Sequence, residues 1–337
     1  MNTRIFATAL TLSIMTVNAA TAADSVNVYS YRQPFLIEPI VESFTEQTGI
    51  EVNTVFAKKG LVERLKNEGK NSPADLLLTS NFSNLQAAVA ADVTQPVISE
   101  TLKANIPSEF RAPDGMWFGL TNRARLIVVS KDRLVESRPA SYEDLANPAY
   151  KGKICTRSGK HSYMVALTAS VMAYSGRDAA RDWLSGMKDN LARKPQGNDR
   201  AQVKAISEGE CDIAIINSYY MGAMLADEEQ TTWANSVDLI FPNQADRGTH
   251  MNISGVALTK AAPNKDNAIK LMEFLSSAEA QQHYADVNHE YPVNQNVKPS
   301  ALVQSWGEFR YDTVPLAKIA EFRNDASRLT DEVNYDN

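Results

Sequence analysis

The chain has 337 residues, with 34 basic and 40 acidic side chains and a formal net charge of -6. Hydrophobic residues make up 44% of it and charged residues 22%, a composition that excludes disordered, fibrous and collagen-like proteins. At roughly 100 to 200 residues per domain, the length predicts two domains, and the lack of a basic block argues against a nucleic-acid partner.

The first 22 residues have the pattern of a secretory signal peptide. Arg4 supplies a positive charge, residues 5–17 are mostly apolar, and residues 20–22 are the small residues of a cleavage site. The apolar stretch is too short to span a membrane as a helix. We therefore expect an exported protein whose mature chain begins near residue 23.

The first part of the mature chain alternates short strands with helices. Strands are predicted at 26–31, 50–56 and 74–79, and helices at 34–48, 59–68 and 84–91. Pro34 suits the first turn of its helix and Gly49 suits the end. The nearly continuous apolar run at 74–79 is typical of a parallel strand buried on both faces. These patterns predict an α/β fold.

A second α/β segment follows. Strands are predicted at 126–130, 152–155 and 211–216, and helices at 163–174, 177–187 and 199–207. Ligands gather at the carboxyl ends of strands in open α/β sheets. The turns at 31–33 and 219–220 both follow strands, so we expect them to face each other across a cleft. No low-complexity linker is present, which indicates that strands join the two lobes.

Cys155 and Cys211 are the chain's two cysteines. An even number in an exported chain favours one disulfide, because such a chain folds in an oxidising compartment. Their wide separation argues against a CxxC redox site or a zinc site. Two free buried thiols remain the alternative.

Catalytic signatures are absent from the sequence. It contains no GxSxG, HExxH or GxGxxG motif. No two histidines have the spacing of three or four residues with which a helix presents metal ligands; they are His161, His250, His283 and His289. We therefore expect a protein that is not an enzyme.

The adjacent pair Tyr219 and Tyr220 is the most informative polar feature. It follows a predicted buried strand, on a turn where both hydroxyls can reach a cleft. Phenolate is a hard oxygen donor, and its unperturbed pKa near 10 means that only a strong Lewis acid holds it ionised at neutral pH. Ferric iron is such an acid.

The chain resembles a known family, the periplasmic ferric-iron-binding proteins of ABC importers, and within it the subgroup rich in tyrosine ligands. The resemblance runs through nearly the whole mature chain. Its most specific stretches are residues 29–33 (YSYRQ), 155–158 (CTRS) leading to Tyr163, 195–202 (PQGNDRAQ), 217–220 (NSYY) and 290–294 (EYPVN). By position, the iron-binding tyrosines of the family fall on Tyr163, Tyr219 and Tyr220.

The resemblance implies a bilobed α/β solute-binding protein of type II, with transferrin-like lobes, two mixed sheets and crossover strands. The N-lobe is expected to comprise residues 23–122 and 240–290, and the C-lobe residues 123–239 and 291–337. The lobes close on Fe(3+), and a permease in the inner membrane recognises the closed form. A monomer in the periplasm is expected.

One departure from the family changes the expected ligand set. Some relatives carry a His-Tyr pair after the first strand, where this chain has Gln33 and Pro34. Five protein ligands are therefore not expected, and water or a small anion such as carbonate should complete the coordination. Arg32 offers a fork of donors, and the helix that begins near Pro34 offers backbone N–H groups. We therefore predict Arg32 and Gln33 as anion binders.

Three further groups of polar residues have predicted roles. Residues 198–202 have the pattern of an N-cap and first helical turn. Asn217 and Ser218 are candidates to orient the tyrosines. Arg123 and Arg125 alternate on a predicted crossover strand and are candidates to line the cleft.

Two other functions compete with iron binding. The same scaffold could bind an organic or oxyanionic solute such as a phosphonate, a polyamine or thiamine. A polyamine would need carboxylates beside the tyrosines, and the segments around Tyr31, Tyr163 and Tyr219 have none immediately adjacent. An exported hydrolase would need a clustered acid and base, which the sequence does not show.

Overall fold

The computed structural model describes residues 24–337, and the predicted signal peptide lies outside these residues. The strands are β1 (Ser25–Ser30), β2 (Glu51–Phe56), β3 (Leu76–Thr79), β4 (Phe118–Ser130), β5 (Ile154–Cys155), β6 (Ile213–Asn217), β7 (Val237–Ile240), β8 (Met251–Leu258) and β9 (Tyr291–Pro292). The α-helices of the first part are α1 (Glu38–Thr48), α2 (Leu61–Glu68), α3 (Phe82–Ala90), α4 (Glu100–Asn105), α5 (Ser162–Ser175), α6 (Arg177–Asp189) and α7 (Asp199–Ser207). Those that follow are α8 (Tyr219–Leu225), α9 (Thr231–Asn235), α10 (Lys265–Leu275), α11 (Ala278–Asp286), α12 (Ala301–Gln304), α13 (Leu316–Glu321) and α14 (Arg323–Glu332). Short 3-10 turns are η1 (Pro34–Leu36), η2 (Gly69–Asn71), η3 (Ser108–Phe110), η4 (Glu143–Ala146) and η5 (Pro148–Tyr150).

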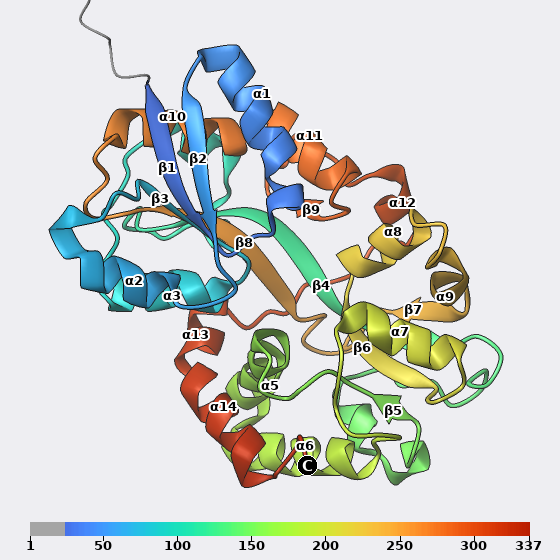
Figure 1. Cartoon of the computed structure of the whole chain (residues 1–337). Helices are drawn as coiled ribbons and strands as arrows, with labels where there is room; N and C mark the ends of the chain where they lie inside the picture. The colour runs from blue at the N-terminus through green and yellow to red at the C-terminus, as the bar shows by residue number, and fades with distance from the viewer. Residues whose placement is uncertain (1–23) are drawn as a thin grey trace, which may run out of the picture.

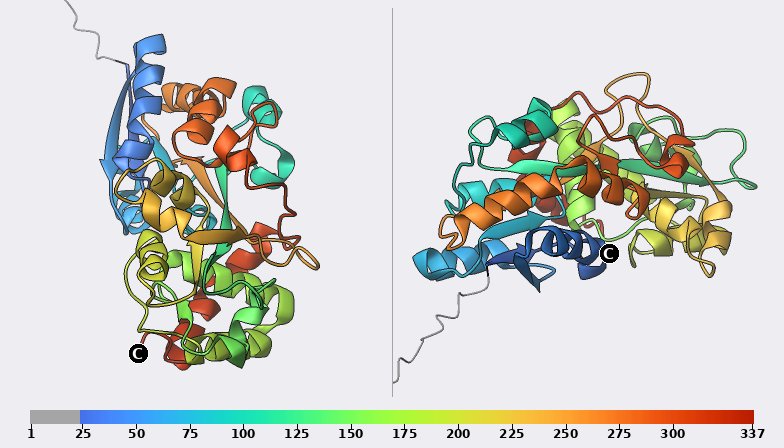
Figure 2. Two further views of the ribbon diagram at one scale, coloured as in Figure 1. Left: turned by 90° about the vertical axis from the view of Figure 1, so that its right-hand side faces the viewer. Right: turned by 90° about the horizontal axis from the view of Figure 1, so that it is seen from above.

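The strands form a mixed arrangement in the order β2-β1-β3-β8-β4-β6-β5 (Figure 1). β1 pairs in parallel with β2 and β3, and β5 pairs in parallel with β6. The long strand β4 pairs antiparallel with β8 and β9 along its first half and with β6 and β7 along its second half. β4 therefore runs through both halves of the molecule, which is elongated with α1 near one end and the C-terminus near the other (Figure 2).

Separate hydrophobic cores lie on either side of the middle of β4. Phe118 and Leu120 belong to a core with β1, β3, β8, α1 and α10. Ile127 and Val129 belong to another core with α5, α6 and α14. This arrangement matches the predicted α/β class of mixed sheets joined by crossover strands. The residue boundaries of the two lobes stay a prediction.

The predicted helix at 34–48 is divided in the structure. Pro34 begins the turn η1, and a new helix, α1, begins at Glu38. Pro39 lies in the first turn of α1, where its missing N–H costs nothing. In a continuous helix the same proline would interrupt the hydrogen-bond ladder, so the chain restarts at Ile37.

Two further features of the fold differ from or extend the sequence predictions. β4 begins at Phe118, well before the predicted strand at 126–130. The prediction missed this start because the first half of β4 carries buried polar residues that interrupt the apolar pattern. Cys155 and Cys211 form a disulfide with a Cα–Cα distance of 5.9 Å, which confirms the predicted pairing over free thiols. Within residues 24–337 no helix combines the length and apolar character needed to cross a bilayer.

Candidate functional site

Tyr219 and Tyr220 stand where β6 ends and α8 begins. β6 is buried along its whole length, so it fixes the place at which α8 starts. Both tyrosines are partly buried, and their ring centroids lie 4.2 Å apart at an angle of 31°. The Ser218 hydroxyl accepts a hydrogen bond from the Ala124 N–H at 3.2 Å, which ties this turn to β4.

Tyr163 reaches the same place from the first turn of α5. His161 caps this helix, because its Nδ1 accepts a hydrogen bond from the Tyr163 N–H at 3.2 Å. The hydroxyl oxygens of Tyr163 and Tyr219 are 3.4 Å apart. The structure therefore brings together the three tyrosines that the sequence singled out.

The environment of these phenols opposes their ionisation while no cation is present. Burial raises the pKa of Tyr219 well above its ordinary value, and the neighbouring Tyr163 and Tyr220 raise it further. Burial and Tyr163 raise the pKa of Tyr220 to about 12. Phenolates this close repel one another, so a multivalent cation between them is the species that would stabilise their charged forms.

Buried arginines surround the ring of Tyr163. The guanidinium carbons of Arg123, Arg125 and Arg157 lie 5.7, 5.9 and 5.1 Å from its centroid. Cationic groups in this position favour the phenolate form of nearby tyrosines. In agreement, the charge of Arg123 lowers the pKa of Tyr219 against the effect of burial.

Asp199 holds two of these arginines in place. Its carboxylate accepts hydrogen bonds from Arg125 at 2.5 Å, from Arg157 at 2.8 Å and from the Asn217 N–H at 2.8 Å. Asp199 is fully buried, and although burial alone would raise its pKa, Arg125 and Arg157 bring it below the ordinary value. The predicted cap of α7 is Asn198, whose side chain accepts a bond from the Ala201 N–H, whereas Asp199 supports the site.

Across the described residues, Arg123 has two buried guanidinium nitrogens without a partner, whereas its neighbours Arg32, Arg125 and Arg157 each have one, the Nε. Arg123 is 2% exposed, and its Nη1 donates to the Ser254 hydroxyl at 2.8 Å. Its Nε and Nη2 have no hydrogen-bond acceptor among residues 24–337. Buried donors of a charged group are costly when unsatisfied, so this end of the site is suited to an anion.

The two residues predicted as anion binders have different environments. Arg32 is buried and donates to Glu290 at 2.7 and 3.2 Å and to Ser254 at 2.5 Å. Gln33, at the start of η1, is exposed. The Ser254 hydroxyl, which accepts hydrogen bonds from both Arg32 and Arg123, links these two arginines. The side chain of Gln33 is instead accessible to solvent.

Two ion pairs of the site were not predicted from the sequence: Arg32 with Glu290, and Arg125 with Asp199. Both acids lie in stretches that carried the family resemblance, at 290–294 and 195–202, and that was the available signal. No signal in the sequence indicated which residues pair, because the partners lie 258 and 74 residues apart in the chain.

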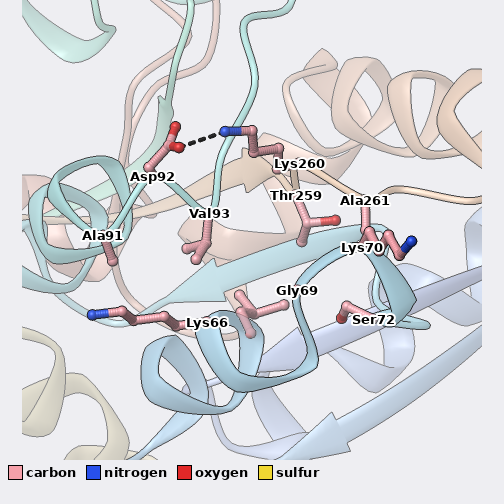
Figure 3. A pocket seen from close by; sticks show the side chains of 11 residues that line it. Lys66, Gly69, Lys70, Ser72, Ala91, Asp92, Val93, Thr259, Lys260 and Ala261 are labelled. Carbon is pink, nitrogen blue, oxygen red and sulfur yellow. Dashed lines mark hydrogen bonds and ion pairs between the residues drawn. The ribbon is translucent and has the colours of Figure 1, made fainter.

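The described residues offer no other candidate metal site, and a cavity among them lies away from the tyrosines. In the described part of the chain, no group of three or more His, Cys, Asp and Glu side chains is placed to hold a metal ion. A cavity of about 480 Å³ lies between α2, the end of α3 and the end of β8 (Figure 3). It is lined by residues such as Lys66, Lys70 and Lys260 and includes none of the three tyrosines.

Comparison with known proteins places this site in context. The model of the bacterial extracellular solute-binding protein family matches residues 39–310. Iron uptake protein A1 of Synechocystis sp. is 42% identical over 313 residues, which cover 92% of this chain and 87% of that protein.

Solved structures agree with the sequence comparison. The apo ferric ion-binding protein A of Pasteurella haemolytica has 52% identity and a TM-score of 0.91, over 94% of this chain and 99% of that one. A Trichodesmium protein solved in complex with iron and citrate ligands has 40% identity and a TM-score of 0.86, over 92% and 99% of the two chains. The chain belongs to the bacterial extracellular solute-binding proteins, in the group of the ferric ion-binding and iron uptake proteins.

Proposed function

We propose that this protein binds ferric iron through the phenolates of Tyr163, Tyr219 and Tyr220 and delivers it to an ABC importer. The observation that carries the proposal is the convergence of three phenols, two of them 3.4 Å apart at their oxygens, beside buried arginines. Three phenolates match the charge of Fe(3+), which is the hard, strongly acidic cation that such donors prefer. The names of the relatives, iron uptake and ferric ion-binding proteins, support the same cargo.

An anion is expected to bind beside the iron. Fe(3+) and three phenolates sum to zero charge, which leaves the positive charge of Arg123 uncompensated. The unpartnered Nε and Nη2 of Arg123 are donors for a small anion such as carbonate. Arg32 and Gln33 remain proposed contributors to this anion site, Arg32 through the Ser254 hydroxyl that it shares with Arg123.

Transport requires a change of shape rather than a chemical reaction. We infer that an N-lobe (23–122 and 240–290) and a C-lobe (123–239 and 291–337) close over the ion. A permease in the inner membrane then recognises the closed form of a periplasmic monomer. The relatives are iron uptake proteins by name, which supports a role in transport.

The visible absorption spectrum tests the proposal. The iron-free mature protein is titrated with a ferric chelate, because phenolate bound to Fe(III) absorbs visible light by charge transfer. We expect a band that saturates at about one iron per chain. Tyr219→Phe and Tyr220→Phe should shift or abolish the band, whereas Tyr174→Phe, at the exposed end of α5, should leave it unchanged. A colourless protein that ignores ferric iron would favour an organic or oxyanionic solute on the same scaffold.

A further inference from the structure

Two buried arginines share a single hydroxyl group beside the proposed iron site. Arg32 donates to the Ser254 hydroxyl at 2.5 Å and Arg123 donates to it at 2.8 Å. Arg32 follows β1, Ser254 belongs to β8 and Arg123 belongs to β4, so separate segments of the sheet meet at this oxygen. The two guanidinium groups form one cationic cluster with Ser254 at its centre.

This cluster contains one carboxylate, and that carboxylate belongs to Arg32. Glu290 accepts two hydrogen bonds from Arg32, at 2.7 and 3.2 Å, and the two side chains are 4% and 2% exposed. Burial alone would lower the pKa of Arg32, but the charge and hydrogen bonds of Glu290 raise it above its usual value. Arg32 is therefore a firmly held cation whose terminal nitrogens are already in use.

The backbone around Glu290 fixes its position. Its N–H donates to the Tyr284 carbonyl at 3.2 Å, and the ring of Tyr284 lies 5.4 Å from the Arg32 guanidinium carbon. The next residue, Tyr291, begins β9 and pairs with Asn122, immediately before Arg123. The carboxylate is thus held beside the cluster by α11 on one side and by β4 on the other.

The charge of the cluster is unbalanced. Arg32 and Arg123 contribute two positive charges and Glu290 one negative charge, which leaves one positive charge in a buried setting. In the described chain, Arg123 has two buried nitrogens without a partner, Nε and Nη2, and Arg32 has one, Nε, so the missing counter-charge belongs chiefly at Arg123.

We propose that Glu290 is the specificity-determining residue of the anion site. By occupying Arg32, it leaves Arg123 as the principal anion donor and limits the site to anions of low charge. The inference rests on the proposed function, because the anion would share the site with the iron. Glu290 acts through Arg32, so it is a positioning residue rather than an iron ligand.

Glu290→Gln tests this role because it keeps the shape of the side chain and removes its charge. The variant presents two positive charges and a released guanidinium fork to an incoming anion. A doubly charged anion should then gain far more than a singly charged one. A merely structural role for Glu290 would not change this preference.

The probes are malonate, a dianion near pH 7.5, and acetate, a monoanion with the same carboxylate chemistry. Isothermal titration of the iron-free protein gives both affinities. For Glu290→Gln we expect the ratio of malonate to acetate affinity to rise about tenfold or more over wild type. Glu308→Gln, an exposed residue, is the matched control and should leave the ratio unchanged.

A double variant keeps the test decisive if Glu290→Gln does not fold. The double variant Arg32→Gln with Glu290→Gln removes the ion pair and leaves the cluster with one positive charge, as in wild type. Its ratio of malonate to acetate affinity should therefore stay within about threefold of the wild-type ratio. Arg32→Gln alone leaves Glu290 to compete for Arg123, so it should weaken malonate binding relative to the double variant. The proposal would be overturned if the ratio of malonate to acetate affinity were unchanged in Glu290→Gln. It would also be overturned if Arg32→Gln and the double variant bound malonate with equal affinity.

The failure of this proposal can be told apart from a failure of the iron assignment. The anion titrations use protein without iron, whereas the iron assignment depends on the visible band of the ferric complex. A wild-type protein with the band but with no Glu290 effect would keep iron binding and reject only the role of Glu290.

Discussion

The hydroxyl oxygens of Tyr163 and Tyr219 lie 3.4 Å apart, although 56 residues separate them in the chain. One comes from the start of α5 and the other from the start of α8, so two helix N-termini present phenols to the same point. At this distance both groups cannot be ionised together without a cation between them. Burial also raises the pKa of Tyr219, so the metal must displace its proton.

Iron affinity should fall as the pH is lowered. Burial is the main cause that raises the pKa of Tyr220 to about 12 and that of Tyr219 well above its ordinary value, so these phenols are protonated at neutral pH before iron binds. Each phenolate formed on binding releases one proton, which lowers the apparent affinity by up to about tenfold per pH unit and per proton. Visible absorbance during ferric titrations between pH 7.5 and 5.5 measures the slope.

Tyr220→Phe supplies the control for this slope. It removes one proton from the reaction, so its affinity should depend less steeply on pH than that of wild type. Affinity that is independent of pH in wild type would rule out phenolate ligation.

Asp199→Asn should destabilise the protein and disturb the iron site. The substitution leaves Arg125 and Arg157 buried without a carboxylate, which typically costs about 3 to 5 kcal/mol. Urea denaturation of the iron-free protein gives the free energy of unfolding. Asp212→Asn is the control, because its partner Arg133 is 41% exposed and such a pair contributes about 1 kcal/mol or less.

The same carboxylate predicts a loss of stability in acid. Arg125 and Arg157 hold the pKa of Asp199 below its ordinary value against the effect of burial. The stabilisation is therefore complete above the unfolded-state pKa, near 4, and is lost as the pH falls through the lower folded-state value. Asp199→Asn should lose less stability over this range than wild type, and an identical decline in both proteins would contradict the assignment.

Removal of the disulfide should cost several kcal/mol. Cys155 and Cys211 close a loop with a sequence separation of 56, for which loop-closure entropy predicts about 4 kcal/mol. The double variant Cys155→Ser and Cys211→Ser should show this loss in urea denaturation. Wild type in reductant should fall to the same stability, while the variant should not respond to reductant.

Gly222→Ala should weaken iron binding through a steric effect. A Cβ at this position of α8 would lie 2.2 to 2.5 Å from atoms of His289, so one of the two segments must move. Gly222 follows Tyr219 by almost one helical turn, and a shift of α8 therefore carries both of its tyrosines. We expect a loss of stability of about 1 to 3 kcal/mol and a weaker visible band at limiting iron.

Rescue by a second substitution separates the steric effect from a helix-propensity effect. His289 has a φ of 53°, a left-handed conformation that glycine adopts readily. His289→Gly removes the obstructing atoms, so Gly222→Ala with His289→Gly should regain the band. A double variant as weak as Gly222→Ala alone would show that the contact is not responsible.

The sequence allowed the prediction of those elements whose apolar pattern is local. β1, β2, α5 and α7 lie within one or two residues of their predicted ranges. The first half of β4 was predicted only in part, as a crossover strand on which Arg123 and Arg125 alternate. Its start at Phe118 was missed, because polar residues that are buried there interrupt the apolar pattern. A periodic pattern of apolar residues does not predict a buried arginine. The contacts that bury Arg123 exist only in the assembled sheet.

The site was predictable to a similar extent. Tyr219 and Tyr220 stood out because they follow an apolar strand, whereas Tyr163 depended on the family resemblance. The charge arrangement could not be predicted, since no local rule connects Arg32 with Glu290 across 258 residues. Short-range patterns therefore identified the candidate ligands, and the fold was needed to show which cation remains without a counter-charge.

The length of β4 has a consequence for how the molecule unfolds. Its 13 residues supply side chains to cores in both halves, with Phe118 and Leu120 in one and Ile127 and Val129 in another. If one core unfolds, β4 loses its packing partners there, and the other core also depends on β4. The two halves are thereby made mutually dependent, and the chain gains a cooperativity that protects each half from proteases for as long as the other stays folded.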